Sequence, residues 1–290
     1  MKNKKAFMFN IILVIISIIV LTAAFLVLLN KNLFDFDIGK RQFEIVKAAD
    51  SAQDISLYIK ESIKLSAAQA IYDLGIYGGY AKNQRCATFE DIAVWQRGDE
   101  ACYPEDVQKN FDILLNENLN KYISQYPLPV GAKIPRDSYE SLIYNNRLTV
   151  NSFENIELNI YEPPANAKIS RYSLKPTYSI PAYYDLDIYQ QTAEQAYDLF
   201  LLCRPFDDAS QIKQCIESSL ENPEFIDWIF LQADADKVFF FEVNTYQQAQ
   251  IYENSKITPK DIAIRFVLYF GKSAVPPTPG TTSPTIPKPE

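Results

Sequence analysis

The residue types that carry out most enzymatic chemistry are scarce or scattered in this chain of 290 residues. It contains no histidine, which excludes Ser-His-Asp and Cys-His nucleophile pairs and the zinc sites built on histidine. Ser210 and Lys213 form one S-x-x-K pattern, which serine acyl-transfer enzymes combine with a K-T-G triad that is missing from this sequence. We therefore predict that Ser210 lies at the N-terminus of a helix and is not a nucleophile.

Carboxylates are the most abundant reactive groups, with 36 acidic against 28 basic side chains and a net charge of −8. Asp234 and Asp236 could serve glycoside hydrolysis if the fold separated them correctly, although this spacing is also typical of a turn before a strand. A cell-envelope hydrolase that uses carboxylates is therefore kept as an alternative. The acidic balance argues against a nucleic-acid partner, and no Walker A or GxGxxG pattern is present. We predict no enzymatic activity, no cofactor and no metal site.

Four cysteines fall into two local pairs, Cys86 with Cys102 and Cys203 with Cys215. Four cysteines allow three connectivities, and the spacing favours disulfides within each pair. The second disulfide would clasp a helical hairpin that turns at residues 204–208, and each short loop contributes about 3 kcal/mol in the loop-entropy model. A metal site of four thiolates lacks the C-x2-C spacing, and buried free thiols are the remaining alternative.

An apolar run near the N-terminus dominates the hydropathy of the chain. Residues 7–29 read FMFNIILVIISIIVLTAAFLVLL and contain no charged side chain. About 20 apolar residues in a helix span the core of a bilayer, so the sequence predicts a transmembrane helix at residues 7–29, with the lipid bilayer as a partner. A cleaved signal peptide is less consistent with a run that is this long and lacks a small-x-small site.

The charges that flank the run predict its orientation. Lys2, Lys4 and Lys5 precede it without any acidic residue, and the positive-inside rule keeps such a cluster in the cytoplasm. We therefore expect a single-pass protein of the cell membrane, with residues 1–6 as a cytoplasmic basic leader and everything after the helix outside the cell.

A long amphipathic helix is predicted to follow as a stalk over residues 30–79. Apolar residues recur there at intervals of three or four: Ile45, Ala48, Ala52, Ile55, Ile59, Ile63, Ala67, Ala70 and Leu74. Glycines at positions 75, 78 and 79 end the pattern. This apolar stripe could pack on the downstream domain or on copies of itself, and the spacing fits both.

Residues 80–271 are expected to form an extracytoplasmic domain of the α+β class, in which an antiparallel sheet is mixed with helices. Acidic residues and Pro104 before an apolar helical pattern predict one helix over residues 104–123. Further helices are expected at residues 189–204, 209–220 and 225–231, and strands at 156–160, 237–245 and 262–270.

Two segments raise the question of a binding role. Residues 161–189 are rich in tyrosine and proline, and tyrosine surfaces can bind protein or glycan, although tyrosine is also an ordinary strand residue. Residues 272–290 are rich in proline and threonine and show no apolar periodicity. We expect that tail to be extended and disordered.

The N-terminal quarter of the chain resembles that of type IV pilin-like proteins, especially archaeal ones. The shared features are a short lysine-rich leader, Ala6 before Phe7, and an apolar helix that continues outward. The resemblance implies cleavage between Ala6 and Phe7 by a prepilin peptidase, followed by bundling of the helices into a filament. Residue 11 is isoleucine and residue 6 is alanine, where that family often has glutamate and glycine.

The chain as a whole resembles uncharacterised single-pass membrane proteins of small-genome archaea, in residues 66–74 (SAAQAIYDL) and in the strands KVFFFEVNT and IAIRFVLYF. That group implies a location but no activity. The sequence therefore predicts a membrane-anchored protein with a structural, adhesive or binding role. A pilin-like subunit that associates with itself through the N-terminal helix is the first alternative.

Overall fold

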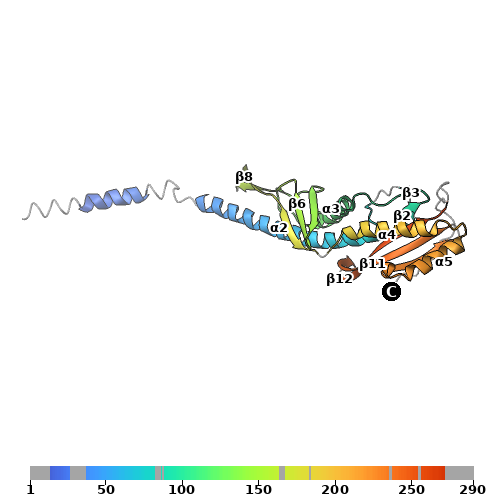
Figure 1. The fold of residues 1–290 in the computed structure, drawn as a ribbon. Helices are drawn as coiled ribbons and strands as arrows, with labels where there is room; N and C mark the ends of the chain where they lie inside the picture. The colour runs from blue at the N-terminus through green and yellow to red at the C-terminus, as the bar shows by residue number, and fades with distance from the viewer. Residues whose placement is uncertain are drawn as a thin grey trace, which may run out of the picture. The chain divides into compact units, whose positions relative to one another are not determined.

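The computed structural model describes residues 14–26, 37–81, 86, 88–162, 167–182, 184–234, 237–253 and 256–271 (Figure 1). Residues 14–26 are helical. The further helices are α2 (Asp37–Ile76), α3 (Val107–Gln125), α4 (Asp187–Cys203), α5 (Ala209–Leu220) and the 3-10 turn η1 (Pro223–Phe225). The strands are β1 (Thr88–Phe89), β2 (Ile92–Arg97), β3 (Glu100–Ala101), β4 (Ala132–Lys133), β5 (Tyr139–Tyr144), β6 (Arg147–Ser152), β7 (Ile156–Glu162), β8 (Ala167–Leu174), β9 (Thr177–Pro181), β10 (Trp228–Asp234), β11 (Val238–Glu253) and β12 (Lys256–Tyr269).

The chain divides into two compact units. The first contains residues 1–53 and 158–172, and the second contains residues 54–157 and 173–290. Helix 14–26 and the N-terminal part of α2 belong to the first unit, and the candidate site described below belongs entirely to the second.

The predicted transmembrane helix at residues 7–29 is corrected by the structure. In the described part of the chain, no helix combines the length and the apolar character that crossing a bilayer requires. Crossing the hydrocarbon core requires about 30 Å of apolar helix, which is about 20 residues at 1.5 Å per residue. The transmembrane part of the predicted fold class and the predicted single-pass location in the cell membrane are therefore wrong. The predicted leader, residues 1–6, lies outside the described residues.

Helix α2 ends where the glycines predict. Gly78 and Gly79 have φ angles of +60° and +86°, a left-handed conformation that stops a helix at little cost only when the residue is glycine. From Ile55 to Leu74 the predicted apolar stripe is buried within the second unit, because Ile55, Ile59 and the later positions are at most 1% exposed. This part of the stripe therefore packs on the protein's own domain.

The largest sheet has the order β1-β2-β12-β11-β10, with β3 paired to β2. Neighbouring strands are antiparallel except β2 and β12, which are parallel, so the predicted antiparallel sheet is mixed at this pair. Two smaller sheets have the orders β5-β6-β9 and β4-β7-β8. The predicted mixture of helices and sheet is thus present.

Both faces of the large sheet are buried around β11. Phe239 and Phe241 point to one face and are fully buried, and Phe241 stacks on Phe266, with ring centroids 5.4 Å apart. Phe240 points to the other face and contacts the ring of Phe89 edge-on. Helices α4 and α5 pack on this sheet through β2, β12 and β10 (Figure 1).

One predicted helix is replaced by a strand. The sequence predicts a helix at residues 225–231, but only Pro223–Phe225 form a 3-10 turn, and β10 begins at Trp228. Asn222 caps this turn by accepting a hydrogen bond from the Glu224 amide. Pairing of β10 with β11 then outweighs the local helical pattern, because it adds a full ladder of backbone hydrogen bonds.

A row of polar side chains on α3 covers the free edge of β5, and the sequence analysis did not predict it. Asn116 accepts a hydrogen bond from the Tyr139 amide at 3.2 Å and donates one to its carbonyl at 2.7 Å. One turn earlier, Asp112 accepts from the Ser141 amide at 3.1 Å. Since β6 is the only described strand that pairs with β5, these side chains protect an edge that would otherwise be open to another strand.

Candidate functional site

An open pocket of about 890 Å³ lies in the second unit, between the segment before α3, the β5–β6 turn and the first three turns of α4. We call it the acidic groove. Five acidic residues line it: Glu105, Asp106, Asp185, Asp187 and Glu194. Five tyrosines line it as well: Tyr103, Tyr144, Tyr184, Tyr189 and Tyr197. None of the described residues that line the groove is a lysine or an arginine.

Two helix N-termini explain why acidic residues gather here. Asp106 is the N-cap of α3 and accepts a hydrogen bond from the Lys109 amide at 2.8 Å. Asp185 accepts one from the amide of Asp187, the first residue of α4, at 2.9 Å. Carboxylates at these positions satisfy free amides and complement the helix dipole. Asp106 and Asp185 therefore stabilise helix N-termini. Glu194, two turns into α4, does not have this structural role.

The tyrosines divide into exposed and buried rings. Tyr144 and Tyr197 are 69% and 42% exposed, so their rings are available to a ligand. Burial raises the pKa of Tyr103 and of Tyr184, and most strongly the pKa of the fully buried Tyr189. The hydroxyls of these three tyrosines are therefore neutral at physiological pH, and none of the three supplies a phenolate as nucleophile or base.

Gly79 packs closely against two residues that line the groove, Pro104 and Tyr189. A Cβ atom at Gly79 would come within 2.7 Å of the Pro104 ring and 3.1 Å of the Tyr189 ring. The Gly79 carbonyl accepts a hydrogen bond from Asn110 of α3 at 2.9 Å. The segment that follows α2 thereby holds the start of α3 and the start of α4 close together, which fixes two walls of the groove.

The third wall is the tight turn between β5 and β6. Asn145 and Asn146 have φ angles of 48° and 56°, the left-handed pair that a type I′ hairpin requires and that asparagine tolerates. This turn presents Tyr144, the last residue of β5. The Tyr-Asn-Asn sequence is therefore explained by hairpin geometry, and its side chains line the groove.

The two residues of the S-x-x-K pattern lie in the first turns of α5. The Ser210 amide donates a hydrogen bond to the Asp208 carboxylate at 3.0 Å, at the N-terminus of α5, as the sequence predicts. Lys213 lies 3.7 Å from Glu217 in an ion pair on the same helix. The Ser210 amide and the Lys213 side chain thus both take part in interactions that stabilise α5.

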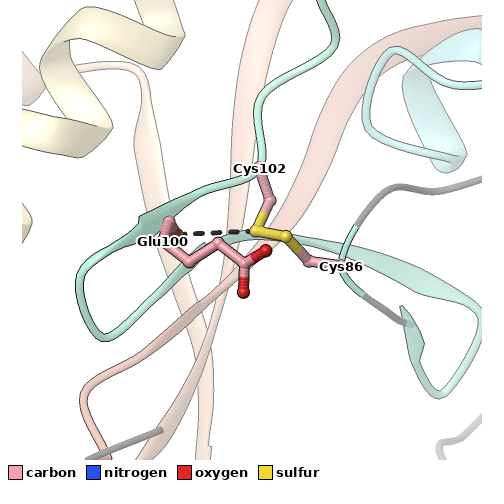
Figure 2. Close-up of side chains that lie close together, drawn as sticks. All are labelled: Cys86, Glu100 and Cys102. Atoms are coloured by element: carbon pink, nitrogen blue, oxygen red, sulfur yellow. Dashed lines mark hydrogen bonds between the residues drawn. A yellow bond between two sulfur atoms is a disulfide. The ribbon is translucent and has the colours of Figure 1, made fainter.

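The two predicted disulfides are present. Cys86 pairs with Cys102, and Cys203 pairs with Cys215, with Cα atoms 5.7 Å apart in both bonds. Figure 2 shows the first disulfide, with Glu100 beside it. Ligand atoms of Cys86, Glu100 and Cys102 lie within 4.8 Å of one another, but the disulfide uses both sulfurs, and a single carboxylate is a poor metal site. The second disulfide joins the last residue of α4 to α5.

Other predicted site residues are not brought together. Asp234 is the last residue of β10, and its intended partner Asp236 lies outside the described residues. Ala6 and Phe7, at the predicted cleavage site, and the tail at 272–290 also lie outside them. Cleavage before Phe7 stays a prediction.

Sequence reasoning missed the acidic groove because its walls come from three distant segments. A local signal existed at each wall: acidic residues before α3, acidic residues before α4, and the Asn-Asn turn. Nothing in the sequence places these three signals side by side.

Comparisons of the chain with protein-family models, with curated proteins and with solved structures found no match.

Proposed function

We propose that this protein is a structural subunit without catalytic activity, which associates with copies of itself through helix 14–26 and presents the second unit as a binding domain. The proposal is the self-associating, pilin-like alternative of the sequence analysis. Two disulfides in the second unit support a protein that works in an oxidising compartment.

The observation that carries the proposal is the surface of helix 14–26. Nine large apolar side chains of this helix are between 50% and 70% exposed. Residues 18–21 are consecutive and all exposed, and four consecutive residues point in four directions around a helix. An apolar helix of this kind needs cover on every side, which a bundle of three or more copies provides and a pair does not.

The polar side chain of Thr22 does not oppose such burial. Thr22 donates from its hydroxyl to the Ile18 carbonyl at 2.6 Å, so its hydrogen bond is made within the helix. Burying a large apolar side chain completely contributes about 1.5–3 kcal/mol. Covering the exposed parts of nine side chains therefore contributes on the order of 10 kcal/mol per helix, comparable with the cost of association.

The test compares two double variants with equal numbers of apolar residues changed to aspartate. Ile16→Asp with Ile19→Asp changes the helix, and Leu142→Asp with Ile226→Asp changes residues of the second unit that are equally or more exposed. Sedimentation velocity of the full chain in detergent-free buffer should show assemblies of the parent protein and of the second variant, and mainly monomers of the first. A monomeric parent protein at micromolar concentration, or equal assembly of both variants, contradicts the proposal.

A further inference from the structure

We infer that the acidic groove binds a basic peptide segment, and that arginine or lysine side chains of this segment enter between Tyr144, Tyr197 and the carboxylates of α4. This inference concerns a different surface from helix 14–26 and does not depend on self-association.

The shape of the groove suits a ligand of this size. A volume of about 890 Å³ lies within the range of pockets that enclose a small molecule or a few peptide residues. The groove is lined by segments that are held together by the packing at Gly79 and by the type I′ turn, so its walls are formed before a ligand arrives.

Charge decides the class of ligand. Five acidic residues line the groove, and no lysine or arginine is among its described lining residues. The negative potential of such a surface attracts cations and repels anions. A neutral glycan would gain little from so many carboxylates, whereas every carboxylate adds to the attraction for a cationic side chain.

The exposed rings indicate how a guanidinium or ammonium group would be held. Tyr144 is 69% exposed at the hairpin turn, and Tyr197 is 42% exposed one turn after Glu194 on α4. A cation over a tyrosine ring is attracted by the ring's negative face, and arginine can stack on the ring while it donates hydrogen bonds to a carboxylate. Gln190 donates to Glu194 at 3.1 Å, which orients this carboxylate on the exposed side of α4.

A divalent cation is a less suitable occupant. Among the described residues, the only group of three metal-ligating side chains found close together is at Cys86, Glu100 and Cys102, outside the groove. The five acidic residues of the groove come from the segment before α3 and from the start of α4, which suits separate positive charges on one peptide.

The experiment measures fluorescence anisotropy of a labelled Gly-Arg-Gly-Arg-Gly-Arg peptide with the full, oxidised chain. A peptide with glutamine in place of each arginine and a neutral oligosaccharide, maltohexaose, are competitors. We expect the arginine peptide to bind and neither competitor to displace it. Raising the salt concentration should weaken binding, since the charges are partly exposed. Equal binding of the glutamine peptide, or displacement by maltohexaose, would overturn the inference.

Two double variants with the same change in net charge locate the binding site. Asp187→Asn with Glu194→Gln neutralises the groove, and Glu217→Gln with Glu221→Gln neutralises the exposed side of α5. We expect the first to weaken binding about 5- to 20-fold, from a fewfold per exposed ion pair, and the second less than about twofold. Equal weakening by both would show non-specific attraction to an acidic protein and would refute the site.

Hydrogen exchange on the unmodified protein keeps the test independent of any loss of folding in a variant. Saturation with the arginine peptide should slow exchange at residues 143–146 and 184–197. Protection elsewhere, with these segments unchanged, would contradict the inference.

Discussion

The disulfide between Cys203 and Cys215 gives the most direct test of how this fold is stabilised. Replacing both residues with alanine removes the bond between the end of α4 and the middle of α5. Alanine is preferable to serine because Cys203 is fully buried, and a hydroxyl there would add the cost of a buried polar group.

The magnitude follows from the loop that the bond closes. Cys203 and Cys215 are 12 residues apart, and a loop of this length corresponds to about 3 kcal/mol in the loop-entropy model. Loss of sulfur contacts at Cys203 adds about 1 kcal/mol. For a domain of about 200 residues, a loss of 3–4 kcal/mol lowers Tm by about 6–16 °C.

The assay is urea unfolding followed by tryptophan fluorescence. The chain has two tryptophans, and both Trp95 and Trp228 are buried against Phe266, so their emission reports the packing of the large sheet. The matched control is Cys86→Ala with Cys102→Ala, whose separation of 16 residues predicts nearly the same loop entropy. A loss below about 1 kcal/mol for the α4–α5 bond would refute the reasoning.

Three further predictions concern single residues. Gly78→Ala should lower the free energy of unfolding by about 2–4 kcal/mol, because it forces a left-handed alanine and places its Cβ 2.6 Å from the Arg265 carbonyl oxygen; a loss under about 1 kcal/mol in thermal unfolding would contradict this. Burial raises the pKa of Asp112 above 3.8, so its native form holds a proton more tightly and its contribution to stability falls as pH rises from about 4 through the native pKa. Asp112→Asn should therefore flatten the pH dependence of urea unfolding in that window, and an unchanged slope would show that Asp112 does not cause it. Asn116→Ala should cost about 1–3 kcal/mol and speed amide exchange in β5, because it leaves both backbone groups of Tyr139 without this partner; unchanged exchange would show that the edge is covered by other means.

Local signals predicted much of the fold. Apolar periodicity, with acidic residues and Pro104 before α3, located α3, α4 and α5 to within a few residues, because these helices bury one face and expose the other. The cysteine spacing predicted both disulfides, because each joins segments that are near in sequence. Such features are determined by residues close together in the chain.

The failures involve properties that depend on distant partners. The local pattern at residues 225–231 predicts a helix. Trp228 and Phe230 instead belong to strand β10, because they pair with residues of β11 that come later in the chain. The apolar run at residues 7–29 predicted a membrane span from hydropathy alone, and no described helix has the length and apolar character that a span requires. The groove was missed for the same reason, since Asp106, Tyr144 and Asp187 become neighbours only in three dimensions.

The contact between α3 and β5 also has a geometric consequence for how this domain can change in evolution. Four residues of a helix rise 6.0 Å, and two residues of a strand advance about 6.7 Å, so Asp112 and Asn116 meet Ser141 and Tyr139 almost in step. The helix spacing and the strand spacing differ by about 0.7 Å per repeat. Side chains of α3 can therefore stay level with residues of β5 over only three or four repeats. A single-residue insertion within α3 would turn the following side chains by 100° and break the match at once, whereas strands joined only by backbone ladders can lengthen freely. We therefore expect α3 to conserve its length more strictly than the β11–β12 hairpin.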